Sequence, residues 1–184
     1  MGSAVLAGES PGETDSGVRV LSLFRTHAGA QKASNLLAAL SVVFLLIFAA
    51  LLRQRLLDRG AEWLSSVAFG GAVILAVGGA ARAGIGWALA TGHDHIEPAA
   101  AQALNVVFES HYPAITGIAV LMFAAWLSIV RSRALPLWLG WAALPIGLLA
   151  VAPPSLVPLI GAGVWIAVAG ILMARREDPA SVPV

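Results

Sequence analysis

Long apolar stretches, almost free of charged side chains, dominate this 184-residue chain. They fall at residues 34–52, 64–90, 113–130, 135–151 and 155–174. A helix needs about 20 apolar residues to cross the hydrocarbon core of a bilayer, within a range of about 17–25. Transmembrane strands would need about 10 residues of alternating polarity, which the sequence lacks. The sequence therefore predicts an all-α fold, a polytopic transmembrane helix bundle with about five spanning helices and short interfacial helices.

Composition and charge narrow the function classes further. The chain is 59% hydrophobic and 11% charged, whereas soluble domains are about 45–50% apolar and about 25% charged. Its net charge of +1 provides no field that would attract nucleic acid. The absence of cysteine excludes disulfides, thiolate catalysis and cysteine-based metal sites. We expect no cofactor and no nucleic acid, and take the lipid bilayer as the partner, together with a membrane-protein partner or a second copy of the chain.

The polar flanks divide the chain into three parts. Residues 1–17 are rich in Gly, Ser and Glu and predict a flexible tail. Residues 18–176 form the predicted bundle, and residues 177–184 a C-terminal tail. Within the bundle, residues 18–32 predict a short amphipathic helix at the bilayer surface or, alternatively, a helix that recruits a partner. Small residues inside the spans predict close helix packing; they include Gly71, Gly78, Gly163 and Gly170.

Basic residues in short loops predict the orientation in the membrane. They occur at 53–62, at 131–134 and at Arg175 and Arg176, whereas residues 91–112 contain neither Lys nor Arg. This alternation places the C-terminus in the cytoplasm of a bacterium, with the protein in its plasma membrane. An odd number of spans then places the N-terminus outside, in conflict with three basic residues there, Arg19, Arg25 and Lys32. A re-entrant or surface-lying first stretch, or a missing upstream helix, would resolve the conflict.

Arg82 is the only charged residue within a predicted span. Ionisable side chains in spans suggest a functional site, because burial in the membrane is costly. The apolar residues 64–81 before it cover about 27 Å at about 1.5 Å per residue. This length favours a snorkelling Arg82 near the outer boundary, and so a mild Arg82→Gln variant that Glu109→Gln does not rescue. The alternatives are a buried ion pair with Glu109 and a cation that binds a solute.

Histidines and carboxylates gather in the outer segment and suggest metal binding as a weaker alternative. They are His93, Asp94, His95, Glu97, Glu109 and His111. In an extended segment, however, His93 and His95 would point to opposite sides. The sequence therefore favours a solvated outer loop, with no metal site and no catalytic residue. Residues 97–109, opened by Pro98, predict a short interfacial or re-entrant helix.

Four short segments resemble a known family. They are Ala134-Leu-Pro-Leu-Trp-Leu-Gly-Trp141, Met173-Ala-Arg-Arg176, Ala101-Gln-Ala-Leu-Asn105 and Phe69-Gly-Gly71. They are similar to small actinobacterial multi-pass membrane proteins of unknown function, typically with six helices, over about residues 18–176. In that family a further helix comes before the part matched here, and its apparent absence would explain the N-terminal charge conflict. The resemblance implies an architecture and no catalytic residue. A content of 10 Arg against 1 Lys also suggests a GC-rich bacterial genome.

Three functions remain open at this point. The favoured one is a non-enzymatic accessory or scaffold protein of the membrane, since the spans carry few polar side chains. The alternative is a small-solute or ion transporter that uses Arg82 and the outer acidic and histidine-rich segment, although no internal repeat is visible. A metal-dependent membrane enzyme using His93, His95 and His111 ranks third.

Overall fold

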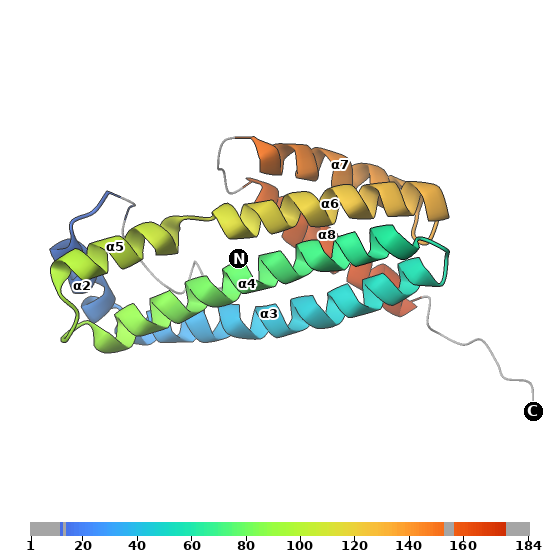
Figure 1. Ribbon diagram of the computed structural model, residues 1–184. Helices are drawn as coiled ribbons and strands as arrows, with labels where there is room; N and C mark the ends of the chain where they lie inside the picture. The colour runs from blue at the N-terminus through green and yellow to red at the C-terminus, as the bar shows by residue number, and fades with distance from the viewer. Residues whose placement is uncertain (1–11, 13, 153–156, 176–184) are drawn as a thin grey trace, which may run out of the picture. The chain divides into compact units, whose positions relative to one another are not determined.

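The computed structural model describes residues 12, 14–152 and 157–175. These residues are helical with short connections and include no strand, as Figure 1 shows. The predicted all-α fold is confirmed. Most of the expected N-terminal tail, the expected C-terminal tail at 177–184, Arg176 and the first residues of the expected span at 155–174 lie outside the described residues.

Each predicted span corresponds to one helix of the structure. The helices are α2 (Gly17–Thr26), α3 (Ala28–Leu57), α4 (Glu62–Gly92), α5 (Pro98–Glu109), α6 (Tyr112–Ser132), α7 (Leu137–Val151) and α8 (Val157–Arg175). The largest difference from the prediction concerns α3, which includes residues 28–33 and 53–57 on either side of its apolar part. Helices extend past their apolar part because each added residue gains one backbone hydrogen bond after the first turn has formed.

Within the described part of the chain, four segments are long and apolar enough to cross a membrane: Ala28–Leu57, Glu62–Gly92, Pro98–Ser132 and Val157–Arg175. The fourth predicted span, 135–151, is the apolar helix α7, which has 15 residues and is shorter than these. Before it, Arg133 has a φ of 51°, a left-handed conformation that commonly ends a helix. Pro136 then occupies the N-cap position of α7.

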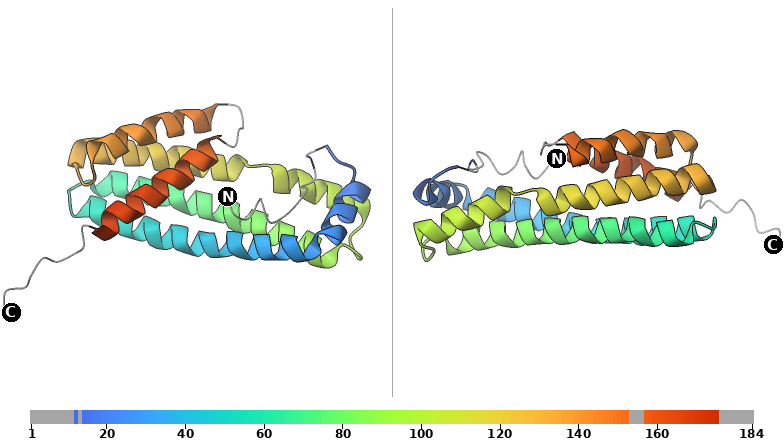
Figure 2. Two further views of the ribbon diagram at one scale, coloured as in Figure 1. Left: turned by 180° about the vertical axis from the view of Figure 1, so that it is seen from behind. Right: turned by 45° about the horizontal axis from the view of Figure 1, so that its top comes forward.

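The described residues form two compact units, and α3 and α4 contribute to both. In the first unit, residues up to Leu45 join residues Ala76–Ala114. Its core contains Val20, Phe24, Leu89, Ala90 and Ala101. Helix α2 lies beside α5, as both views of Figure 2 show. The predicted amphipathic helix therefore packs its apolar face against protein.

Glycine and tryptophan organise the second unit, which joins residues 46–75 to residues from Ile115 onward. A Cβ added at Gly117 in α6 would lie 2.7 Å from the Cα of Leu75 in α4, so these helices pack backbone to backbone. In α8, Trp165 donates a hydrogen bond of 2.8 Å from Nε1 to the carbonyl oxygen of Leu139 in α7. These contacts bring α4 and α6 together and join α7 to α8.

Candidate functional site

Arg82 and Glu109 form an ion pair in the first unit. Nη2 of Arg82, in α4, lies 3.5 Å from Oε1 of Glu109, the last residue of α5. Nη1 donates a hydrogen bond to the carbonyl oxygen of Phe108, and the guanidinium carbon lies 4.0 Å from the centroid of the Phe108 ring. The last carbonyls of a helix lack intrahelical donors and carry partial negative charge. The end of α5 therefore offers Arg82 a carboxylate, a carbonyl and an aromatic face.

The Arg82–Glu109 pair is partly buried. The side chain of Arg82 is 37% exposed and that of Glu109 is 20% exposed. Oε1 of Glu109 is buried and makes no hydrogen bond to any described residue, so the guanidinium is the charged group that faces it. The structure therefore brings together the pair that the sequence offered as an alternative, while the snorkelling of Arg82 at the membrane boundary stays a prediction.

Matched helix lengths explain why these two residues meet. Arg82 lies ten residues before the end of α4 at Gly92, and Glu109 lies eleven residues after the start of α5 at Pro98. The turn between the helices reverses the chain, so equal rises of about 1.5 Å per residue bring both side chains to one level. Pro98 marks the start of α5 in the sequence, and the near-equality of these spacings, ten and eleven residues, could have favoured the ion pair.

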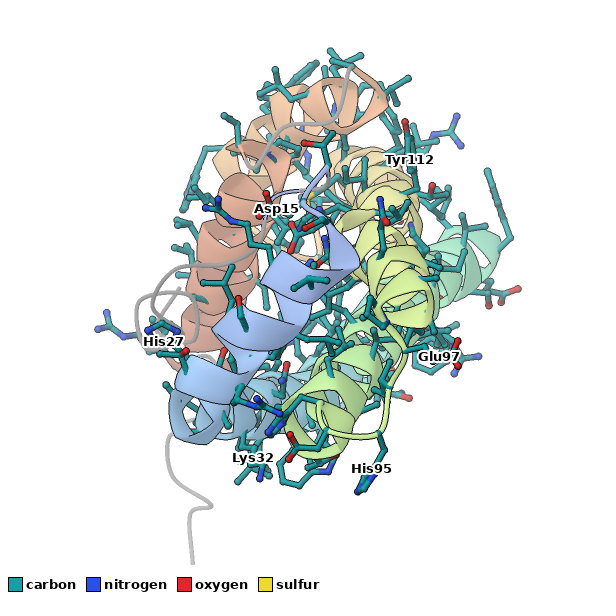
Figure 3. All side chains as sticks on the ribbon, turned by 90° about the vertical axis from the view of Figure 1, so that its left-hand side faces the viewer. Asp15, His27, Lys32, His95, Glu97 and Tyr112 are labelled. Atoms are coloured by element: carbon teal, nitrogen blue, oxygen red, sulfur yellow. The ribbon has the colours of Figure 1, made fainter. Side chains whose placement is uncertain are left out.

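The turn after α4 places the outer histidines differently from the prediction. The backbone amides of His95 and Ile96 donate to the carbonyl oxygen of Gly92, over 2.8 and 3.1 Å. The segment is a tight turn rather than extended, so the expected opposite directions of His93 and His95 do not follow. Figure 3 shows His95 projecting outward from this turn. His111 lies between α5 and α6.

Asp94 makes an ion pair that the sequence did not indicate. Arg25 of α2 pairs with its carboxylate, and Nε2 of His93 lies 3.4 Å from its Oδ2. The hydrogen bond from Arg25 lowers the pKa of Asp94 below its ordinary value, and the positive charge of Arg25 contributes further. A solvent-exposed carboxylate that stays ionised in this way connects α2 to the turn. Among the described residues, no three His, Asp or Glu side chains are grouped so that they could hold a metal ion.

Basic residues gather at one end of the second unit. Nη2 of Arg55, near the end of α3, donates a 3.1 Å hydrogen bond to the carbonyl oxygen of Met173, near the end of α8. A pocket of about 190 Å³ lies between the α3–α4 turn and the end of α6, and its lining includes Arg59, Trp63 and Arg131. Gly60 permits this turn with a φ of 77°. The basic loops that the sequence assigned to one side of the membrane therefore meet.

Comparisons with protein-family models, with curated proteins and with solved structures found no match to this chain. The features of the chain that bear on its function are the Arg82–Glu109 pair, the basic end of the second unit and the apolar faces of the long helices.

Proposed function

We propose that this chain is a non-enzymatic integral membrane protein of a bacterial plasma membrane, where it serves as an accessory or scaffold subunit for another membrane protein. The observation that supports this proposal is the exposed apolar face of α3. Phe44, at its middle, is 69% exposed. The other exposed apolar side chains of α3 are Leu36, Leu37, Leu40, Val43, Leu46, Ile47 and Leu51.

Such a face suits a partner within the membrane. Large exposed apolar patches mark membrane or protein interaction sites, and helices associate in lipid mainly through close packing of their side chains. Resemblance to the actinobacterial multi-pass family supports the bacterial source. The basic end of the second unit, which includes Arg55, Arg59 and Arg131, supports a cytoplasmic C-terminus with residues 91–112 outside.

Site-specific photocrosslinking tests the accessory role. A benzophenone amino acid at Phe44 should form a discrete adduct with a second polypeptide in intact cells. An adduct of twice the chain's mass would identify a second copy as the partner. Val164 of α8 is 59% exposed and provides a matched control position, at which we expect crosslinks to lipid alone. Absence of a protein adduct at Phe44, or equal adducts at both positions, would contradict the proposal.

Transport of a small solute or ion is a second candidate function, favoured by the Arg82–Glu109 pair. Ionisable pairs inside candidate spans mark many solute and proton pathways, and Arg82 lies within the candidate span Glu62–Gly92. Liposomes containing the purified protein and a pH-sensitive or chloride-sensitive dye test this function. Flux that exceeds protein-free liposomes and disappears in Arg82→Gln would support transport, whereas flux equal to empty liposomes would argue against it for these ions.

A further inference from the structure

An apolar groove of about 400 Å³ lies between α3 and α4 in the first unit. Its lining residues are Asn35, Leu36, Ala39, Val42, Ala80, Ala83, Gly84 and Trp87. The volume falls within the range of about 300–1,000 Å³ that is typical of small-molecule sites. Seven of the eight lining residues are apolar or aromatic, so the groove suits a hydrocarbon chain.

Asn35 is the polar exception in this lining. Asn35 is 7% exposed, and its side-chain nitrogen Nδ2 has no hydrogen-bond partner among the described residues. The amide packs on Gly86, where a Cβ would collide with it. A buried amide donor without an acceptor is unfavourable and uncommon. The groove is therefore apolar along its length, and the side chain of Asn35 in its lining holds an unpartnered donor that is buried against Gly86.

The position of Asn35 along α3 suggests which acceptor it meets. Asn35 directly precedes the apolar run that begins at Leu36, and it shares its end of the groove with Trp87, a residue type that favours the membrane interface. Val42 lies seven residues further along α3, about 10 Å deeper at about 1.5 Å per residue. One turn before Asn35, on the same helix face, is the cationic residue Lys32, labelled in Figure 3.

A phospholipid presents matching chemistry in the same order. From the membrane surface inward, it offers a phosphate, an ester carbonyl and an acyl chain. We propose that the groove binds one acyl chain of a membrane phospholipid, that the Asn35 amide turns from Gly86 toward the groove so that Nδ2 donates to the ester carbonyl oxygen, and that Lys32 lies close to the phosphate. The groove borders the exposed face of α3 and shares Leu36 with it, but Phe44, where the crosslinker is placed, does not line the groove, so failure of this proposal would leave the accessory role untouched.

Ester-linked and ether-linked lipids distinguish this proposal, because an ether lipid lacks the carbonyl acceptor. Purified full-length protein in detergent is titrated with ester-linked or ether-linked phosphatidylglycerol of identical chains, and thermal unfolding and bound lipid are measured, the latter by native mass spectrometry. We expect the ester lipid to bind about two- to tenfold more tightly, the equivalent of one neutral hydrogen bond. Asn35→Leu should make the two lipids equal.

Gly84→Leu provides a second variant and does not depend on the amide. A Cβ at Gly84 meets no atom within 4 Å, so a leucine there would fill the groove without disturbing the helix. It should weaken binding of both lipids at least tenfold. Gly163→Leu in α8, where a Cβ also meets no atom within 4 Å, is the matched control and should retain the ester preference.

Two results would overturn the proposal. One is equal binding of ester and ether lipids to the wild-type protein. The other is undiminished lipid binding by Gly84→Leu, which would place the lipid elsewhere on the chain. If the groove instead binds a helix of a partner protein, it does not recognise the ester group of a lipid, and the two lipids should again bind equally.

Discussion

Removal of one member of the Arg82–Glu109 pair should destabilise the protein, and removal of both should restore much of the loss. At the 3.5 Å separation of Nη2 and Oε1, two unit charges attract by about 5 kcal/mol at an effective dielectric constant of about 20, and by about 1 kcal/mol in water. Desolvation of both groups offsets part of this attraction. Loss of one partner from a fully buried pair costs about 3–5 kcal/mol.

Partial exposure lowers the expected cost at this site. With Arg82 37% and Glu109 20% exposed, we expect Arg82→Gln and Glu109→Gln each to cost about 2–3 kcal/mol. Water solvates part of either stranded charge, and the Phe108 carbonyl also accepts a hydrogen bond from a stranded Arg82. The double variant should reveal a coupling free energy of about 1–3 kcal/mol. Reversible unfolding in mixed micelles, followed by tryptophan fluorescence, measures all four free energies of the cycle.

The Asp15–Arg19 pair provides the control cycle. Nε of Arg19 lies 3.3 Å from Oδ2 of Asp15, but the arginine side chain is 61% exposed. Exposed pairs at this helical spacing contribute about 0.3–0.5 kcal/mol. A coupling free energy at Arg82 and Glu109 no larger than that of this control would refute the reasoning, and a mild Arg82→Gln variant would support the snorkelling interpretation.

Three further predictions concern topology, helix packing and pH. In this cysteine-free chain, Thr91→Cys should react with a membrane-impermeant thiol reagent in intact cells and Ser132→Cys should not; the opposite pattern would reverse the proposed orientation. Gly117→Ala should cost about 1–3 kcal/mol because its Cβ meets backbone, whereas Gly163→Ala should add about 0.4–1 kcal/mol of stability, as measured by unfolding in micelles. Because its ion pair lowers the pKa of Asp94, the stability that this carboxylate contributes is complete above its unfolded pKa of about 3.9 and is lost as pH falls through the lower folded value. The protection of α2 amides against hydrogen exchange, taken relative to intrinsic exchange at each pH, should therefore fall in acid, and Asp94→Asn should lower this protection with little dependence on pH.

Hydropathy and proline positions predicted most of the helices. Pro98 begins α5 where the sequence placed a short helix, and α6 extends from Tyr112 to Ser132, close to the expected 113–130. These features depend on local sequence, because every backbone group in a membrane helix is satisfied within its own segment. The bounds of α3 were less predictable, since its polar ends continue the helix past the apolar run.

The spacing of residues in the sequence does not predict which of them contact a neighbouring helix. Gly71 and Gly163 occur in similar apolar helices, yet a Cβ at Gly71 would collide with the α6 backbone and one at Gly163 would meet open space. The prediction of close packing is therefore confirmed for Gly71 and wrong for Gly163. The sequence does not indicate a role for Asn35 either, because nothing in its local sequence shows which side of α3 the next helix covers. The Arg25–Asp94 pair likewise joins residues 69 apart in sequence.

The proposed topology implies that membrane thickness affects the stability of the short helix α7. In the proposed topology α7 crosses the bilayer, yet its 15 residues extend about 22 Å at about 1.5 Å per residue, against a hydrocarbon core of about 30 Å. The surrounding lipid must thin to match it, at a fraction of a kcal/mol for each ångström. The 30-residue α3 can tilt instead and is far less sensitive. Shorter acyl chains should therefore favour insertion of the α7–α8 hairpin, and a cell that lengthens its lipids would selectively weaken this part of the protein.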